Sequence, residues 1–106
     1  MKKSSAHLQL EDNTPGVWRL SGDLSMYGVS DLWKTLKKHL PRSGAWKIDS
    51  KGVSMMDSAG IALLLNCMRH AKRHNVTLSI IALPAAAKDL IQAQGVAELF
   101  KDCEFR

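Results

Sequence analysis

The order of apolar and polar residues along the chain predicts strands that alternate with helices. Residues 7–10 and 17–20 alternate apolar and polar side chains as half-buried strands do, and the turn-forming run 11–16 lies between them. These two segments therefore predict a hairpin or an antiparallel pair. Residues 45–49 and 76–81 predict two further strands, the second of them rich in β-branched side chains.

Three other segments carry the period of an amphipathic helix. The first runs from an N-cap at Ser30 to the residue before Pro41, which cannot continue a helix. The second spans residues 58–75 and has a broad apolar stripe, and the third spans residues 85–94 and is ended by a glycine. Helices between strands favour a parallel or mixed sheet with right-handed crossovers.

The predicted order is β-β-α-β-α-β-α plus a C-terminal segment, residues 96–105, that has no clear pattern. Residues 1–6 form a polar tail, and residues 7–106 are expected to form a single domain. A chain of 106 residues with 45% apolar side chains is long enough to bury one independent core. The fold class is therefore α/β.

The chain is basic, with 15 Lys and Arg against 10 Asp and Glu and a formal net charge of +5. Such a balance would attract phosphates, anionic lipid headgroups or an acidic protein face. The simpler interpretation is a solvated surface, because cations near a helix C-terminus are also favoured by the helix dipole. Nucleic-acid binding is not predicted, since no motif for it accompanies the charge. The cations gather near the ends of two predicted helices: Lys34, Lys37, Lys38, Arg42, Arg69, Lys72 and Arg73.

The sequence predicts a cytoplasmic protein. Its longest nearly apolar run, residues 60–65, is far shorter than the roughly 20 residues of a membrane-spanning helix. No charged-then-apolar signal segment opens the chain. Cys67 and Cys103 do not have CxxC spacing, and we expect both to be reduced.

The spacing of the chemically reactive residues argues against an enzyme. His70 and His74 could form a two-histidine metal pair on one helix, but no further ligand accompanies them, so a surface pair is favoured. Cys67 lies in mid-helix without a neighbouring base and is interpreted as a small apolar residue. The sequence contains no phosphate-binding glycine loop, GxSxG or HExxH motif. We expect no catalytic residue, metal or cofactor, and no tight binding or hydrolysis of nucleotide by the chain alone.

One helix start departs from ordinary patterning. Asp57 and Ser58 begin the second predicted helix, and small residues follow at Ala59, Gly60 and Ala62. Glycine within a helix costs about 1 kcal/mol relative to alanine, so Gly60 indicates a steric requirement. That requirement could be the approach of a partner or only packing under the sheet, and Ser58 could be only an N-cap.

The surface around this helix start is suited to a protein partner. Residues 50–57 are predicted to form a loop that exposes two methionines, which adapt to partner surfaces but could also pack over the sheet edge. Leu63 is assigned to an exposed face, because it lies on the same side of the helix as Asn66 and His70. The predicted partner-binding residues are Met55, Met56, Asp57, Ser58, Ala59, Leu63 and Asn66.

Two motifs give the chain a resemblance to a known family. Residues 57–65, DSAGIALLL, resemble the D-[ST]-x-G-hydrophobic signature of STAS domains, the fold of anti-sigma-factor antagonists. Residues 20–24, LSGDL, resemble the end of the second strand of that family, S/T-G-[ED]-L. The predicted element order fits the family over residues 7–102. The resemblance implies a STAS-like mixed sheet with helices packed mainly on one face.

Within this family the chain is most similar to the STAS subunits of Mla-type phospholipid-transport ABC complexes. The similarity lies in residues 62–65, Leu32-Trp33 and residues 71–78. It implies a non-catalytic protein that docks on the cytoplasmic ATPase of such a complex and stabilises or regulates it. The complex, which includes a permease, maintains outer-membrane lipid asymmetry. The chain would then be cytoplasmic and associated with the inner membrane only through its partners.

The resemblance also implies a second function. In anti-sigma-factor antagonists the Ser or Thr after the Asp of the signature is phosphorylated by a switch kinase, and this position is Ser58 here. In the Mla-type subunits the same position lies at the contact with the ATPase. Many family members carry Asp where this chain has Ser25, and that Asp is associated with the kinase interaction. This departure counts against regulation by phosphorylation more than against ATPase docking.

Overall fold

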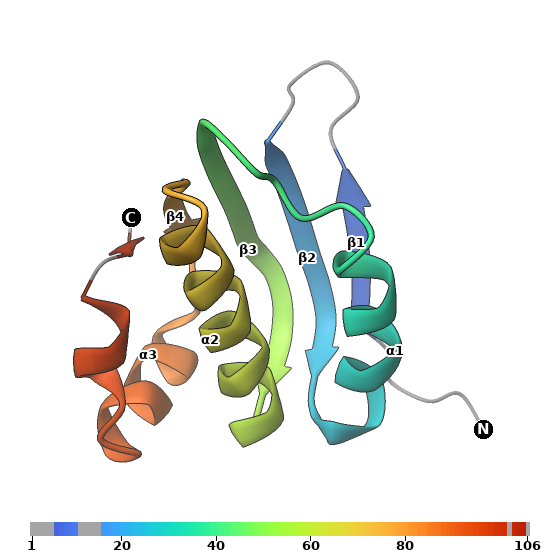
Figure 1. Cartoon of the computed structure of the whole chain (residues 1–106). Helices are drawn as coiled ribbons and strands as arrows, with labels where there is room; N and C mark the ends of the chain where they lie inside the picture. Colours follow the sequence, from blue (N-terminus) through green and yellow to red (C-terminus); the bar gives the residue numbers. More distant parts are fainter. Residues whose placement is uncertain (1–5, 11–15, 102, 106) are drawn as a thin grey trace.

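The computed structural model describes residues 6–10, 16–101 and 103–105 of the chain. Its strands are β1 (Ala6–Leu10), β2 (Val17–Leu24), β3 (Ala45–Met56), β4 (Thr77–Ile81) and β5 (Glu104–Phe105). They form one mixed sheet in the order β1-β2-β3-β4-β5 (Figure 1). β1 and β2 pair antiparallel, and each later strand pairs parallel with the one before it.

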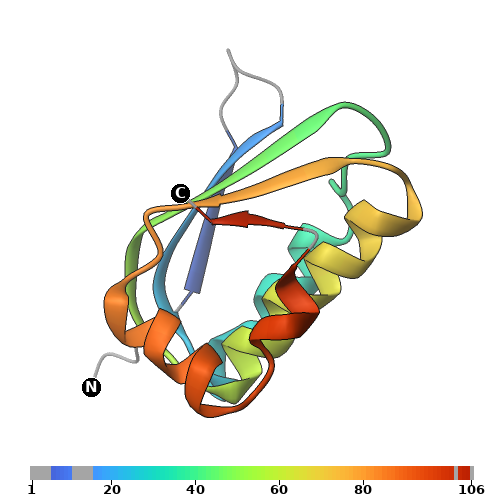
Figure 2. The same ribbon diagram turned by 90° about the vertical axis from the view of Figure 1, so that its left-hand side faces the viewer.

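The helices of the described residues are α1 (Met26–Leu36), α2 (Ser58–Arg73), α3 (Ala85–Ala93) and a short 3-10 helix, η1 (Ala97–Phe100). They lie on one face of the sheet (Figure 2). The α/β class and the predicted order β-β-α-β-α-β-α are therefore confirmed. The C-terminal segment, which had no clear pattern in the sequence, adds η1 and β5.

The predicted pairing of the first two strands is confirmed, with Leu8 opposite Leu20 in the register. β1 begins at Ala6, one residue before the predicted start of the strand and at the last residue of the predicted polar tail. The remaining tail, residues 1–5, and most of the predicted turn, residues 11–15, lie outside the described residues.

Three predicted boundaries were wrong. α1 ends at Leu36, four residues before the end that the sequence predicted ahead of Pro41. The other two boundaries are set by contacts between distant residues. α1 begins at Met26 rather than at Ser30, with Ser25 at its N-cap position, and the Met26 N–H donates to the Asp57 carboxylate. The loop predicted over residues 50–57 is largely strand, because β3 continues to pair with β2 as far as Met56. Neither contact can be deduced from the local pattern.

The core lies between the sheet and the helices and contains two tryptophan rings in edge-on contact. The indoles of Trp18 and Trp46, on neighbouring strands, are both buried and lie 4.7 Å apart with edge-on geometry. The ring of His70, on α2, lies edge-on to Trp46 at 6.2 Å. Its Nε2–H donates to the carbonyl of Pro41 at 2.6 Å, so His70 fastens α2 to the loop after α1. His70 and His74 are both half-buried, so the predicted pair is present but is less exposed than the sequence indicated.

The predicted end of the second helix is confirmed. Asn75 adopts a left-handed conformation with φ of 57°, which asparagine tolerates better than most residues. The Val76 N–H then donates to the carbonyl of Ala71 at 2.8 Å, as in a Schellman motif. This local signal was sufficient to place the end of α2 correctly.

Gly60 allows α2 to begin directly against the ends of two strands. A Cβ at this position would collide with the carbonyl oxygen of Leu24 and would lie 2.6 Å from Cγ of Met56. The steric requirement inferred from the sequence is therefore present. Within the described residues, the absence of a side chain at Gly60 makes room for the protein's own β2 and β3. This agrees with the interpretation of Gly60 as packing under the sheet.

We expect Gly60→Ala to lower the free energy of unfolding by about 1–3 kcal/mol, the usual cost of overpacking. This loss should exceed the gain of about 1 kcal/mol that alanine offers as a better helix former. Urea denaturation would measure the change. Ala62→Gly, at an exposed position of the same helix, calibrates the propensity contribution. A Gly60→Ala protein as stable as the wild type would contradict the close approach.

Candidate functional site

The candidate site lies at the edge where the parallel strands end. β2, β3 and β4 run in one direction, and α1, α2 and α3 begin beside their carboxyl ends (lower edge of Figure 1). The strand ends and the helix starts lie close together at this edge. In open α/β sheets, ligands and partners commonly bind at this edge. Most of the predicted partner-binding residues, from Met55 to Ala59, lie here.

Asp57 links the starts of two helices. Its Oδ1 accepts a hydrogen bond from the Ala59 N–H at 2.8 Å, and its Oδ2 accepts one from the Met26 N–H at 3.2 Å. The first bond makes Asp57 the N-cap of α2, and the second satisfies an N–H at the start of α1. The prediction that Ser58 caps the helix was therefore wrong. Asp57 has a structural role that the sequence did not reveal.

Ser58 is the first residue of α2 and is exposed, as the sequence predicted. Its hydroxyl oxygen accepts a hydrogen bond from the side-chain amide of Gln94 at 2.9 Å. Gln94 follows the last residue of α3, so this bond joins the start of α2 to the end of α3. The Ser58 hydroxyl thus lies on the surface, between two helices.

Two exposed methionines flank Asp57. Met55, at the end of β3, is 60% exposed, and Met26, at the start of α1, is 67% exposed. Met56 instead is partly buried and packs on the core beside Gly60, so only one of the two predicted methionines is exposed. Sequence reasoning missed Met26 because it placed the start of the first helix at Ser30. Pairing the two strand-to-helix junctions as parallel neighbours would have brought Met26 beside Met55.

Leu63 is a core residue, and its assignment to an exposed face was wrong. It is only 1% exposed. Helical spacing correctly places it on the same side of α2 as His70, but this side faces α1 and the loop after it, to which His70 is bonded. The spacing alone does not show which side a neighbouring helix covers. A glutamate at Leu63 would therefore test the core and not the surface.

The other predicted residues of α2 differ in exposure. Ala59 is half-buried, whereas Asn66 is exposed. Ser58, Ala62 and Asn66 are all exposed and follow one another at a spacing of four residues, so they form one ridge along the helix. Asn66 lies about 12 Å along the axis from Ser58 and not at the helix start itself.

Comparison with protein families identifies the fold. The family model described as "Mlab, STAS domain" matches residues 6–101. The chain belongs to the STAS-domain family. Within this family it is MlaB-like, as the sequence motifs indicated.

Solved structures of STAS-domain proteins have the same fold. The anti-sigma factor antagonist SpoIIAA in its unphosphorylated form superposes with a TM-score of 0.67 at 15% identity, covering 95% of this chain and 86% of that one. The Bacillus cell fate determinant SpoIIAA in its phosphorylated form gives 0.65 at 17% identity, covering 94% and 91%. A STAS-domain protein from Planctomyces limnophilus gives 0.69 at 14% identity, covering 95% and 89%. These matches confirm the predicted STAS fold.

The position at which this STAS domain departs from the family motif is buried. Ser25 is 7% exposed and occupies the N-cap position of α1, where its carbonyl accepts from the N–H groups of Gly28 and Val29. Its hydroxyl oxygen has no hydrogen-bond partner within the described part of the chain. Ser25 therefore shapes the helix start and offers little surface to a partner.

The nucleophilic and imidazole groups of this STAS domain lie away from the candidate site. Burial raises the pKa of Cys67 to about 12, with a smaller contribution from Cys103, so its thiol stays protonated near neutral pH. The rings of His70 and His74 lie 4.4 Å apart. The pKa of His74 is lowered, first by desolvation and then by neighbouring cations. The described residues contain no group of three side chains that could hold a metal ion.

Among the described residues, no helix is long and apolar enough to cross a membrane.

We expect Asp57→Ala to lower the free energy of unfolding by about 2 kcal/mol, because it removes acceptors from two helix starts and a cap contributes about 1 kcal/mol. Ser58→Ala should cost less than about 1 kcal/mol, since it removes one exposed hydrogen bond. Urea denaturation of both variants would measure the difference. If Ser58→Ala were as destabilising as Asp57→Ala, Ser58 rather than Asp57 would be the dominant cap.

Proposed function

We propose that this protein docks on the cytoplasmic ATPase of an Mla-type phospholipid-transport ABC complex and stabilises or regulates it. It acts by binding and carries out no reaction itself. Through that ATPase and its permease it takes part in maintaining the lipid asymmetry of the outer membrane. The chain is cytoplasmic and reaches the inner membrane only through the complex.

The observation that carries this proposal is the match of residues 6–101 to the MlaB-type STAS family. The STAS fold is built for protein–protein contact, and the MlaB-like sequence favours an ATPase over other partners. The position of the contact is argued separately, from the surface at the carboxyl ends of the strands. The identity of the partner and the position of the contact are therefore supported by different observations.

The docking surface combines apolar anchors with small residues. Met26 and Met55 expose flexible thioether side chains, and burying such a side chain contributes about 1.5–3 kcal/mol. Ala59 and Ala62 are small enough for a partner backbone to approach α2 closely. The ridge continues to Asn66, whose amide can donate and accept hydrogen bonds. The complete proposed surface consists of Met26, Met55, Met56, Asp57, Ser58, Ala59, Ala62 and Asn66.

We expect Met55→Glu and Met26→Glu each to reduce co-purification of the ATPase at least tenfold while leaving the fold intact. Both side chains are largely exposed, so the free protein tolerates a charge that the interface would have to desolvate. The tagged chain would be co-expressed with the ATPase and the permease, and the recovered subunits quantified. Leu99→Glu is the matched control, because Leu99 is also exposed, at 47%, but lies in η1.

The possible outcomes test the identity of the partner and the position of the docking surface separately. If the wild type does not retain the ATPase, the proposed function is wrong. If the wild type retains it and both methionine variants do so equally well, the partner is right and the docking surface is misplaced.

A second candidate function is supported by the exposure of Ser58. Its hydroxyl is at the surface, directly after Asp57, at the start of a helix. The anti-sigma factor antagonist SpoIIAA, which has this fold, has been solved in unphosphorylated and phosphorylated forms. The second proposal is therefore an anti-sigma-factor antagonist that a switch kinase controls by phosphorylating Ser58. Phosphate on Ser58 in protein isolated from its native host would favour it, and recovery of an ATPase would favour the first.

We expect Ser58→Asp to keep the fold but lose the ATPase. The helix N-terminus favours a negative charge by about 0.3–1 kcal/mol, so the free protein should tolerate it. In the complex the new carboxylate would be desolvated beside Asp57, which costs more than the dipole contributes. A thermal melt and a pull-down would be run on Ser58→Asp with Ser58→Ala as the uncharged control. Undiminished ATPase binding by Ser58→Asp would exclude Ser58 from the interface.

A further inference from the structure

The end of the molecule opposite the candidate site is strongly basic. α1 and α2 end near the edge where β3 and β4 begin (upper part of Figure 1). The chain has no Asp or Glu in residues 32–48 or in residues 58–88, the stretches that contain the ends of α1 and α2 and the starts of β3 and β4. Cations are frequent there, and neither stretch supplies a carboxylate to balance them.

A groove lies within this basic end, between α1 and α2. Its volume is about 330 Å³. Trp33 and Leu40 are half-buried and provide an apolar part of the lining. The bond from His70 to the Pro41 carbonyl fixes the wall where α2 meets the loop after α1. The lining residues are Trp33, Leu40, Asn66, Arg69, His70 and Arg73.

The charged side chains of the groove are arginines on one face of α2. Arg69 and Arg73 are exposed and four residues apart, so they are neighbours on the helix surface. Arg42, in the loop after α1, lies near enough to His74 to lower its pKa, as does Arg73. No carboxylate pairs with Arg42, Arg69 or Arg73 within the described residues. An anion bound here would relieve the repulsion among these cations.

We infer that this groove binds a phosphate ester that carries a small apolar group. Guanidinium groups form paired hydrogen bonds to phosphate oxygens, so Arg69 and Arg73 together suit one phosphate. The Asn66 amide adds a donor, and the side chains of Trp33 and Leu40 contact the apolar part. The same chemistry is found in a phospholipid headgroup and in a soluble phosphate ester. The site shares only Asn66 with the docking surface, and its two arginines do not depend on the proposed ATPase.

The size of the groove favours a small phosphate over an acidic peptide. A volume of 330 Å³ is at the lower end of the roughly 300–1,000 Å³ of small-molecule sites. A single phosphate group can engage both arginines at once, whereas an acidic peptide would have to extend beyond the groove to place its carboxylates. We therefore make polyglutamate binding an outcome of the test.

The test uses the whole chain at about 150 mM salt, where long-range attraction is screened. Phenyl phosphate, which carries one apolar group, would be titrated by NMR as the soluble probe. Flotation with vesicles of phosphatidylglycerol and phosphatidylcholine, compared with phosphatidylcholine alone, would test the lipid headgroup. The double variant Arg69→Gln/Arg73→Gln removes both guanidinium groups. Arg69→Lys/Arg73→Lys keeps the charge but loses the paired geometry.

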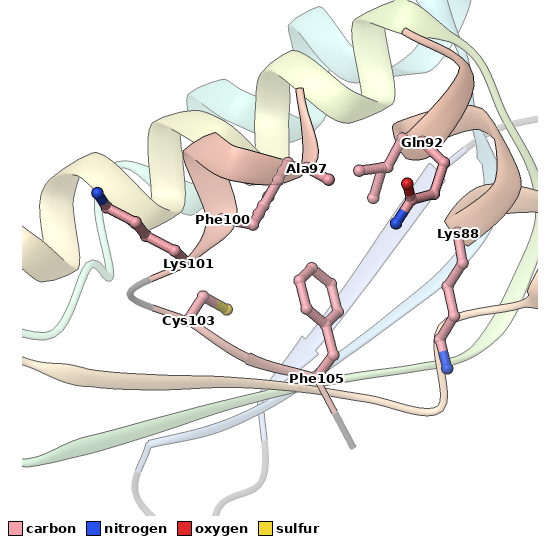
Figure 3. Close-up of a pocket in the computed structure, with 8 residues that line it drawn as sticks. Lys88, Gln92, Ala97, Phe100, Lys101, Cys103 and Phe105 are labelled. Carbon is pink, nitrogen blue, oxygen red and sulfur yellow. The ribbon is translucent and has the colours of Figure 1, made fainter. Parts of the chain in front are cut away.

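A second cavity supplies a control with the same change in net charge. It has a volume of about 400 Å³ and lies between α3, η1 and β5, with Lys88 and Lys101 at opposite ends of its lining (Figure 3). Lys88→Gln/Lys101→Gln removes two cations outside the groove. All four substituted residues are exposed, so we expect every variant to fold, as a thermal melt would verify.

We expect the Arg-to-Gln variant to weaken binding at least tenfold, the Arg-to-Lys variant to weaken it severalfold, and the lysine control to change it less than twofold. Dependence of phenyl phosphate binding on the arginines would support a soluble ligand, and the same dependence seen only with phosphatidylglycerol vesicles would support a lipid headgroup. Binding of neither probe, equal losses in the arginine and lysine variants, or equally tight binding of polyglutamate would overturn the inference.

Discussion

The carboxylate of Asp57 determines how the two central strand-to-helix units fit together. Its two oxygens accept from Met26 and Ala59, its N–H donates to Leu24, and its carbonyl accepts from Ile61. One residue thus satisfies backbone groups at the end of β2 and at the starts of α1 and α2. The absence of a side chain at Gly60 lets this junction close, because any Cβ there would meet the backbone of Leu24. The positions of the exposed methionines on either side follow from the same junction.

The fold separates two surfaces of different chemistry. At the carboxyl ends of the strands, Met26 and Met55 offer apolar contact around a carboxylate whose oxygens are already bonded. At the opposite edge, arginines gather beside Trp33 with no carboxylate from the adjoining segments. The central βα units produce this division, because α1 and α2 start at one edge of the sheet and end near the other. The domain therefore offers apolar contact to a protein at one end and arginines to an anion towards the other, and Asn66 is the residue that both surfaces share.

Features encoded by neighbouring residues were predictable from the sequence. The strand and helix order, the antiparallel pair and the end of α2 at Asn75 follow from periodicity and from residues suited to turns. Features that depend on contacts between distant residues were not. The start of α1 depends on Asp57, thirty-one residues away, and the length of β3 depends on its pairing with β2. Leu63 was misplaced for the same reason, because α1 covers a side of α2 that spacing alone leaves open.

The hydrogen bond between Ser58 and Gln94 links the candidate surface at the start of α2 to the end of α3. The Gln94 amide donates to the Ser58 hydroxyl oxygen, the same atom that a phosphoryl group would occupy. A phosphoryl group on this oxygen, or a partner group that bonds to it, would change the acceptor available to the Gln94 amide and so alter how the end of α3 is held. A change at the start of α2 would then affect the end of α3 through one hydrogen bond, with no rearrangement of the sheet.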